Sequence, residues 1–333
     1  RMYLWTHDRT YLDDPAFVEF YRRSVTDYVA RWDLSPDKAA GRERFMNTDK
    51  QVPQVSRGIP SYDEGRPGQT RLGVDLPAFQ TAAYRAYADI LRLRGDSDDA
   101  KTFEARAAEV ERFIVEHFWD QANGRFNELL LTDGSYMVDG DMRAYVLYAG
   151  ATASPEKIAR TLESLVNGGS VNIEMGSYYP EIFYRYGAHD AAYRKLLELS
   201  DSQTPRREYP EVSFAVVGAI VNGLMGISPT ETKSRVETLS RLTAPLSYAQ
   251  VNGVPIHGNV IDVRHNGRTE TILTNHSGKT ITWVAEFYGT GPIEVNGTKV
   301  DGKPGKDESG QSFTWTEVLV PSGQSRTART SAR

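Results

Sequence analysis

The stretch EVSFAVVGAIVNGLMGI, residues 211–227, decides how the rest of the chain is interpreted. After Glu211 it carries no charged side chain. A helix that is apolar on nearly every side belongs inside a fold rather than on its surface. Gly218 and Gly223 would let neighbouring elements approach its backbone closely. The stretch therefore predicts a buried inner helix that begins near Pro210.

The helices predicted upstream of this stretch alternate in character. Three of them are poor in charge outside their first turns, at 76–94, 141–150 and 175–187. Three others are amphipathic and charged on one side, at 98–118, 154–167 and 189–200. Amphipathic helices suit an outer ring and apolar helices an inner one. Residues 1–228 are therefore predicted to form helical hairpins in two concentric layers, an α/α toroid whose apolar helices are the more buried.

Downstream of Pro229 the spacing of apolar residues changes. Instead of the helical spacing of three or four residues, every second residue is apolar. Alternating residues such as Thr271 and Leu273 are separated by the turn signals Asn266-Gly267 and Asn296-Gly297. This pattern predicts an antiparallel β-sandwich as a second domain over residues 229–333, with a disordered tail from Arg326.

The first residues also bear on the organisation. A cap at Asp14-Pro15 and helical spacing of aromatic and apolar side chains predict one helix as far as Trp32.

The polar segment 35–73 is rich in Gly and Pro and is too long for an ordinary connection, which favours a functional loop. A complete six-hairpin toroid has twelve helices, whereas this chain supplies eight and the tail of a ninth. We therefore expect the missing N-terminal part of the same protein to precede Arg1.

Composition excludes several function classes. The 333 residues carry a net charge of −5, without a dominant basic cluster, so no nucleic-acid partner is expected. The longest apolar stretch, residues 214–227, is too short to span a bilayer, so no membrane partner is expected either.

The absence of cysteine removes thiol and zinc–thiolate chemistry, and the six histidines show no metal spacing, so we expect no cofactor and no metal. The same absence favours a periplasmic or secreted location over a cytoplasmic one.

Acidic and aromatic residues gather just before the apolar helices, whose N-termini would meet at one mouth of a toroid. Carboxylates bind hydroxyl groups and supply acid–base catalysis, while tyrosine rings cover the apolar faces of pyranoses. This combination predicts a site for an oligosaccharide or glycoside substrate, although the helix dipole alone also favours acids in a first turn. The candidate residues are Tyr62, Asp63, Glu64, Asp75, Asp141, Glu174, Tyr178, Tyr179, Arg207, Glu208, Tyr209 and Glu211.

Two resemblances to known families become visible at these positions. Residues 211–227 resemble the last barrel helix of the bacterial α-L-rhamnosidase-like six-hairpin glycosidases, and residues 3–32 resemble their early barrel. Ser61-Tyr62-Asp63-Glu64-Gly65 ahead of Val74-Asp75-Leu76 resembles the trehalase and α-glucosidase I type of toroid. The chain departs from the rhamnosidase pattern because it lacks both the acid-bearing Asp-Cys-Pro loop and the Trp-Glu motif that carries the base.

The resemblance implies hydrolysis of a glycosidic bond with inversion, by an acid and a base whose carboxyls stand roughly 6.5–9.5 Å apart. By analogy with the trehalase-type loop, the expected acid is Asp63 or Glu64. The expected base is Glu208 or Glu211, from their position ahead of the last inner helix, with Glu174 in reserve for either role. Arg207 is expected to keep a neighbouring carboxylate ionised. The tyrosines, Asp75 and Asp141 are expected to bind substrate.

Two other interpretations remain open on the same toroid. A polysaccharide lyase would use a tyrosine with a histidine or arginine, and Tyr178, Tyr179 and His189 fit that pattern. The lack of a histidine at any inner-helix start argues against it. The other alternative is a non-catalytic glycan-binding fragment.

Overall fold

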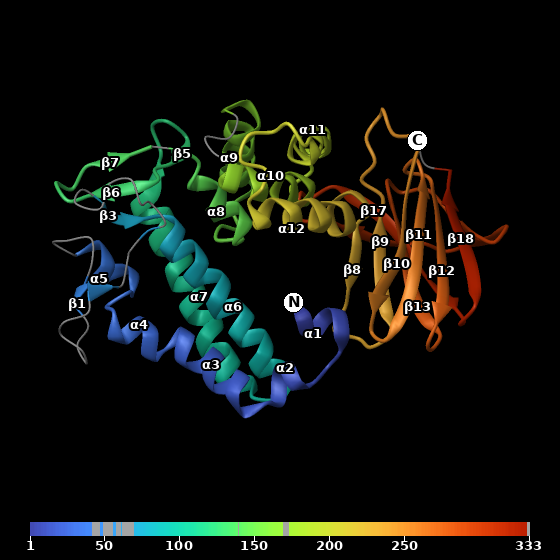
Figure 1. Ribbon diagram of the computed structural model, residues 1–333, viewed down its shortest axis with the longest axis horizontal. Helices are drawn as coiled ribbons and strands as arrows, with labels where there is room; N and C mark the ends of the chain where they lie inside the picture. The colour runs from blue at the N-terminus through green and yellow to red at the C-terminus, as the bar shows by residue number, and fades with distance from the viewer. Residues whose placement is uncertain are drawn as a thin grey trace. The chain divides into compact units, whose positions relative to one another are not determined.

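The fold is described from a computed structural model. The described residues are 1–41, 47–48, 56–57, 61, 70–138, 140–168 and 173–331. They fall into two compact units, each of which is described by itself (Figure 1). The helical unit is Arg9–Met175, and the sandwich unit is Arg1–Asp8 together with Gly176–Arg333. The predicted domain boundary at 228/229 separates the helical part of the sequence from the β part, which is a different criterion from compactness. It remains a prediction.

The helical unit is built around two long helices that run side by side, α6 (Asp75–Arg94) and α7 (Ser97–Phe118) (Figure 1). Gly95 ends α6 with a left-handed φ of 94°, which the Gly-Asp signal at this position predicts. The remaining helices of this unit are α2 (Thr10–Asp13), α3 (Pro15–Val25), α4 (Asp27–Arg31), α5 (Pro36–Ala40), α8 (Arg143–Tyr148), α9 (Pro155–Gly168) and the start of α10 (Ile173–Arg185).

Short strands complete the helical unit. They are β1 (Asn47–Thr48), β2 (Ser56–Arg57), β3 (Thr70–Gly73), β4 (Trp119–Asp120), β5 (Arg125–Phe126), β6 (Leu129–Leu131) and β7 (Tyr136–Met137). Strand β6 pairs with both β3 and β7, so residues far apart in sequence meet in one small sheet. The turns of these short strands contain Gly124 and Gly134, both at positive φ.

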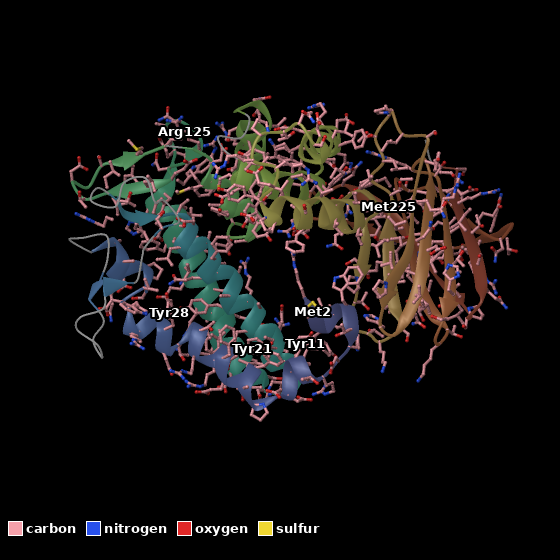
Figure 2. All side chains as sticks on the ribbon, in the orientation of Figure 1. Met2, Tyr11, Tyr21, Tyr28, Arg125 and Met225 are labelled. Atoms are coloured by element: carbon pink, nitrogen blue, oxygen red, sulfur yellow. The ribbon has the colours of Figure 1, made fainter. Side chains whose placement is uncertain are left out.

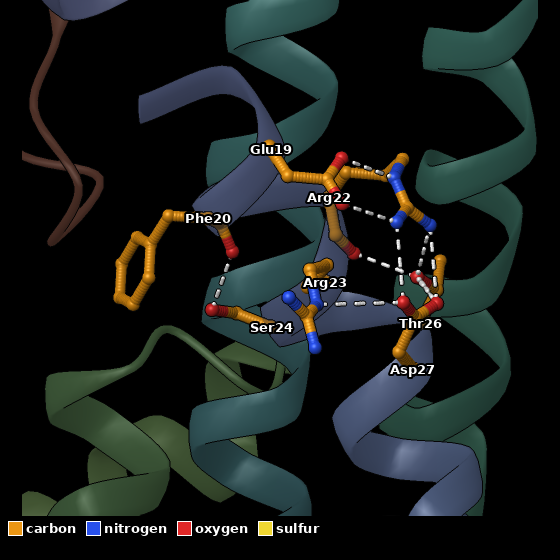
Figure 3. A network of polar contacts seen from close by, with 7 residues as sticks. All are labelled: Glu19, Phe20, Arg22, Arg23, Ser24, Thr26 and Asp27. Carbon is orange, nitrogen blue, oxygen red and sulfur yellow. Dashed lines mark hydrogen bonds and ion pairs between the residues drawn. The ribbon is translucent and has the colours of Figure 1, made fainter. Parts of the chain in front are cut away.

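The predicted helix from Pro15 to Trp32 is interrupted at Thr26, where φ is −125° and ψ is −77°. Figure 3 shows the polar network around this break. The guanidinium of Arg22 donates to Glu19 at 2.9 Å and to Asp27 at 3.1 Å, so one side chain joins the ends of α3 and α4. These pairs are half-exposed, so they contribute little to stability, although they link the two sides of the break.

The sandwich unit contains α1 (Met2–Thr6), α11 (His189–Ser200), α12 (Pro210–Gly218) and the π-helix η1 (Ala219–Leu224), besides α10 from Gly176 onward. The predicted single inner helix 211–227 is therefore divided at Gly218. Within α12 only Val212 is buried, whereas Phe214 and Val217 are 76% and 61% exposed. The prediction of a buried inner helix is wrong for α12. The expected difference in burial between inner and outer helices does hold for α8 and α9. Most of α8 is buried, whereas α9 buries only Thr161 and Leu165.

The β-sandwich consists of two sheets. Its strands are β8 (Ile227–Pro229), β9 (Arg235–Leu239), β10 (Tyr248–Ile256), β11 (Asn259–Asn266), β12 (Glu270–Ser277), β13 (Ile281–Tyr288), β14 (Ile293–Val295), β15 (Thr298–Val300), β16 (Lys303–Lys306), β17 (Ser312–Val320) and β18 (Gln324–Thr330). One sheet has the order β10-β11-β12-β18-β14-β15 and the other β16-β17-β13-β9-β8. The pairing is antiparallel except between β9 and β13, which are parallel.

The sandwich core lies between the inner faces of these sheets. Trp283 is fully buried and donates its indole N–H to Thr238 Oγ1 at 2.8 Å. Met225, labelled in Figure 2, belongs to the same core and joins the end of η1 to the sheets. Strand β18 places Ala328 in this core, so the prediction of a disordered tail from Arg326 is wrong over the described residues.

Within the described part of the chain, no helix combines the length and the apolar character needed to cross a membrane.

Candidate functional site

A buried cluster of carboxylates in the helical unit is centred on Arg143. Its Nη1 donates to Glu128 Oε1 at 2.5 Å and to the Gly140 carbonyl at 2.9 Å. Its Nε donates to Ser164 Oγ at 3.0 Å, and its Nη2 lies 3.7 Å from Asp141 Oδ1. The guanidinium therefore fixes two acids, one from the strand β6 side and one from the approach to α8.

Glu128 is held from its backbone as well as its side chain. Its N–H donates to the Met137 carbonyl and its carbonyl accepts from Val74 N–H, each at 2.9 Å. Its side chain is completely buried. Because an unpaired buried charge is strongly destabilising, the pairing of Glu128 with Arg143 is a condition for placing an acid here.

Asp75 joins the same cluster from the first turn of α6. Ser61 Oγ donates to Asp75 Oδ1 at 3.1 Å and lies 3.7 Å from the sulfur of Met142, the residue between Asp141 and Arg143. A Cβ at Gly73 would come within 2.2 Å of Asp75 Oδ1 and 2.3 Å of Ser61 Oγ. Glycine at this position is therefore what allows the contact between Ser61 and Asp75.

Taken together, the start of α6 and the segments before β6 and α8 carry three buried carboxylates, two of which contact Arg143, while the third, Asp75, accepts from Ser61. Asp75, Glu128 and Asp141 are 4%, 0% and 3% exposed. Carboxylates held rigidly by an arginine and a serine are suited to accept hydrogen bonds from sugar hydroxyls at fixed positions. Among the described residues, no group of three or more histidines and acids is placed to hold a metal ion.

The predicted site residues of the helical unit have different outcomes. Asp75 and Asp141, predicted from separate helix starts, lie in this one cluster. Glu174 is half-buried in the first turn of α10. Tyr62, Asp63 and Glu64 lie outside the described residues.

The other predicted residues belong to the sandwich unit. Tyr179 is buried and Tyr178 half-buried in α10. Glu208 is exposed, whereas Glu211 is half-buried in the first turn of α12. Tyr209 lies under Arg206, whose guanidinium carbon is 4.6 Å from its ring centroid and whose Nη2 donates to its hydroxyl.

Arg207 contacts a hydroxyl group, and its expected effect on a neighbouring carboxylate stays a prediction. Over the described residues, the contact of its guanidinium is Ser213 Oγ, at 3.2 Å, rather than a carboxylate. The cause is local, because Ser213 lies one turn into α12 and faces the loop that carries Arg207.

His189, the histidine of the lyase alternative, is buried, and neighbouring side chains contact both of its ring nitrogens. Its Nδ1 accepts from Arg268 Nη2 at 3.0 Å, and Tyr288 Oη lies 3.5 Å from its Nε2. Burial, reinforced by Arg268 and Arg241, lowers the pKa of His189 to about 4. These contacts tie α11 to the sandwich and use both ring nitrogens, which disfavours His189 as a catalytic base.

Sequence reasoning missed Glu128 and Arg143. A signal was available in the sequence, because Glu128 directly precedes the apolar run Leu129-Leu130-Leu131. An acid beside an apolar run that becomes buried needs a cationic partner.

The comparisons with known proteins bear on the fold. No family model and no curated protein matches the sequence. Solved structures do match it, among them the α-L-rhamnosidase from Dictyoglumus thermophilum, with 13% identity and a TM-score of 0.61 over 98% of this chain. The GH78 family rhamnosidase of Bacillus sp. GL1 matches with 13% identity and a TM-score of 0.55 over 83% of the chain. A protein described as a kojibiose phosphorylase from the human microbiome matches with 11% identity and a TM-score of 0.55 over 97%.

The chain therefore shares the fold of six-hairpin glycosidases, as the sequence resemblance predicts. It spans 38%, 30% and 48% of the length of these three proteins, respectively.

Proposed function

We propose that this protein is a glycoside hydrolase that cleaves its substrate with inversion. The observation that carries the proposal is the set of buried carboxylates Asp75, Glu128 and Asp141 in a glycosidase-like fold, of which Glu128 and Asp141 contact Arg143 and Asp75 accepts from Ser61. Rigid, buried carboxylates at helix starts are suited to orient a sugar ring for attack. An α-L-rhamnoside or an α-glucoside of the trehalose type is the proposed substrate.

The roles follow from the requirements of inversion. A protonated carboxyl donates to the leaving oxygen, while a second carboxylate activates a water on the opposite face of the ring. We assign the first role to Asp63 or Glu64 and the second to Glu208 or Glu211, with Glu174 in reserve. Asp75 and Asp141 bind substrate hydroxyls, and Arg143 acts as a positioning residue that holds Asp141. Tyr62, Tyr178, Tyr179 and Tyr209 cover the apolar faces of the sugar.

The test compares turnover of activated aryl glycosides with that of alkyl glycosides or disaccharides. Replacement of the true acid, by Asp63→Asn or Glu64→Gln, is expected to cost several orders of magnitude on poor leaving groups. It should cost far less on nitrophenyl glycosides, which need little protonation. Replacement of the base, by Glu208→Gln or Glu211→Gln, should impair both substrates alike.

Glu163→Gln is the matched control, because Glu163 is an exposed acid on α9. Its activity should equal that of the wild type. If all four site variants also retain wild-type turnover on both substrates, the assignment of acid and base is wrong.

A further inference from the structure

A second cavity lies in the helical unit, bordered by α4, α5, α6 and α7. Its volume is about 560 Å³, within the range of cavities that bind small ligands. None of the residues of the Arg143 cluster lines it. It is therefore distinct from the Arg143 cluster.

The floor of this cavity is apolar. It is formed by Val25, Val29, Val110 and Phe113, in which Val110 is only 4% exposed. Aliphatic side chains and one aromatic ring contact the C–H groups of a ligand without demanding hydrogen bonds. The floor alone would accept any apolar group, so selectivity has to come from the polar groups around it.

Tyr84 of α6 supplies a buried polar group in the cavity wall. The residue is 6% exposed, and its ring centroid lies 6.0 Å from that of Phe103. Within the described residues its hydroxyl has no hydrogen-bond partner. Burial raises the pKa of Tyr84, with opposing effects from Arg106 and Glu109, so both of these charged groups act on the hydroxyl. The Tyr84 hydroxyl is not among the fully buried polar atoms, so it is open to the cavity and can exchange a hydrogen bond to water for one to a bound ligand.

The rim carries charges of both signs. Arg106, Glu109 and Asp37 line the cavity, and none of them forms an ion pair in the described part of the chain. The contact of Arg106 is the ring of Phe103, whose centroid is 4.7 Å from the guanidinium carbon. Asp27, in contrast, is held by Arg22 and Arg23 and fixes the wall (Figure 3). Lys38 also lines the cavity but pairs with Asp33 at 3.5 Å, so the charged groups without an ion pair are Arg106, Glu109 and Asp37, beside the Tyr84 hydroxyl.

We propose that this cavity is a second, non-catalytic binding site for a neutral saccharide. The apolar floor and Phe113 would contact the C–H face of a sugar ring, while Tyr84, Arg106, Glu109 and Asp37 would bind its hydroxyls. Charges of both signs at the rim disfavour a strongly charged ligand. The many donors and acceptors suit a molecule with many hydroxyl groups. The proposal depends on the lining of the cavity and not on the hydrolytic activity.

The test titrates the full chain with L-rhamnose, D-glucose, maltose and cellobiose, by calorimetry and by hydrogen exchange. Binding of at least one of them should protect residues 25–38 and 106–113. Tyr84→Phe keeps the ring and removes only the hydroxyl, so it should weaken this binding about tenfold. Ala30→Trp fills the cavity and should abolish it.

Tyr87→Phe is the matched control. Tyr87 lies on the same helix, is 9% exposed and packs its ring on Phe103, but it does not line the cavity. Its replacement should leave binding unchanged, and all three variants should retain wild-type hydrolysis. The proposal is overturned if none of the four saccharides binds, or if Tyr84→Phe and Ala30→Trp bind as the wild type does. It is also overturned if the protection lies elsewhere. Loss of hydrolysis in the variants of the proposed acid or base would leave this binding intact, so the two proposals fail separately.

Discussion

At the scale of single residues, a buried charged group needs ion pairs and hydrogen bonds to replace the water it has lost. Arg143 satisfies this requirement with Glu128, Ser164 and the Gly140 carbonyl, and it holds Asp141 beside them. The sequence predicted Asp75 and Asp141 from their places at helix starts. It could not predict their convergence, because the contact runs through Ser61 and Met142, which carry no signal of their own.

A different acid, Glu286 of β13, is half-buried and predicts a pH dependence of stability. Burial and the neighbouring Glu237 raise its pKa from about 4.5 to about 8. Between these two values the unfolded chain loses the proton while the folded chain keeps it. The free energy of unfolding should therefore fall as the pH rises through this window, by up to about 1.4 kcal/mol per pH unit for this group.

Glu286→Gln should remove this dependence and be more stable than the wild type near the upper end of the window. Urea denaturation at a series of pH values measures the effect, with the exposed acid Glu231→Gln as the control. Identical pH profiles for Glu286→Gln and the wild type would refute the prediction.

At the scale of elements, periodicity predicted the helices whose apolar faces pack within one unit. The positions Phe103, Ala107, Val110 and Ile114 are all buried in α7, as their helical spacing predicts. Composition was less reliable for α12, because an apolar sequence indicates that a helix tends to be buried but not which neighbour covers it. The tail at β18 was misread since its alternating residues are mostly polar, and only pairing with β12 and β14 orders them.

The two glycines of residues 211–227 have opposite roles, which a pair of substitutions can separate. A Cβ at Gly223 would lie 2.4 Å from the ring of Tyr184, whereas nothing lies within 4 Å of a Cβ at Gly218. Gly223→Ala should therefore destabilise the fold by about 1–3 kcal/mol, because the buried ring has to move. Gly218→Ala should be neutral or stabilise it by up to about 1 kcal/mol, because alanine is the better helix former.

Chemical denaturation of the two variants beside the wild type measures this difference. The packing of η1 described above would be wrong if Gly223→Ala were as stable as Gly218→Ala.

At the scale of the whole molecule, the sequence predicted the order of helical and β segments along the chain and the glycosidase-like fold, whereas two closed concentric layers stay a prediction. The alternation of apolar and amphipathic helices followed by period-two strands indicated a six-hairpin glycosidase fold, and the structural neighbours share that fold. The proposed acid and base come from segments of different units, so their separation of roughly 6.5–9.5 Å stays a prediction. Helical periodicity describes one element at a time and carries no information on how distant segments meet.

The most direct test of the account is the anomeric configuration of the first sugar released. The full chain is incubated with 4-nitrophenyl α-L-rhamnopyranoside and with 4-nitrophenyl α-D-glucopyranoside, and the products are followed by proton NMR before mutarotation. A two-carboxylate inverting mechanism predicts that the β-anomer appears first from the substrate that is cleaved. First appearance of the α-anomer, or no release of sugar from either substrate, would contradict the account.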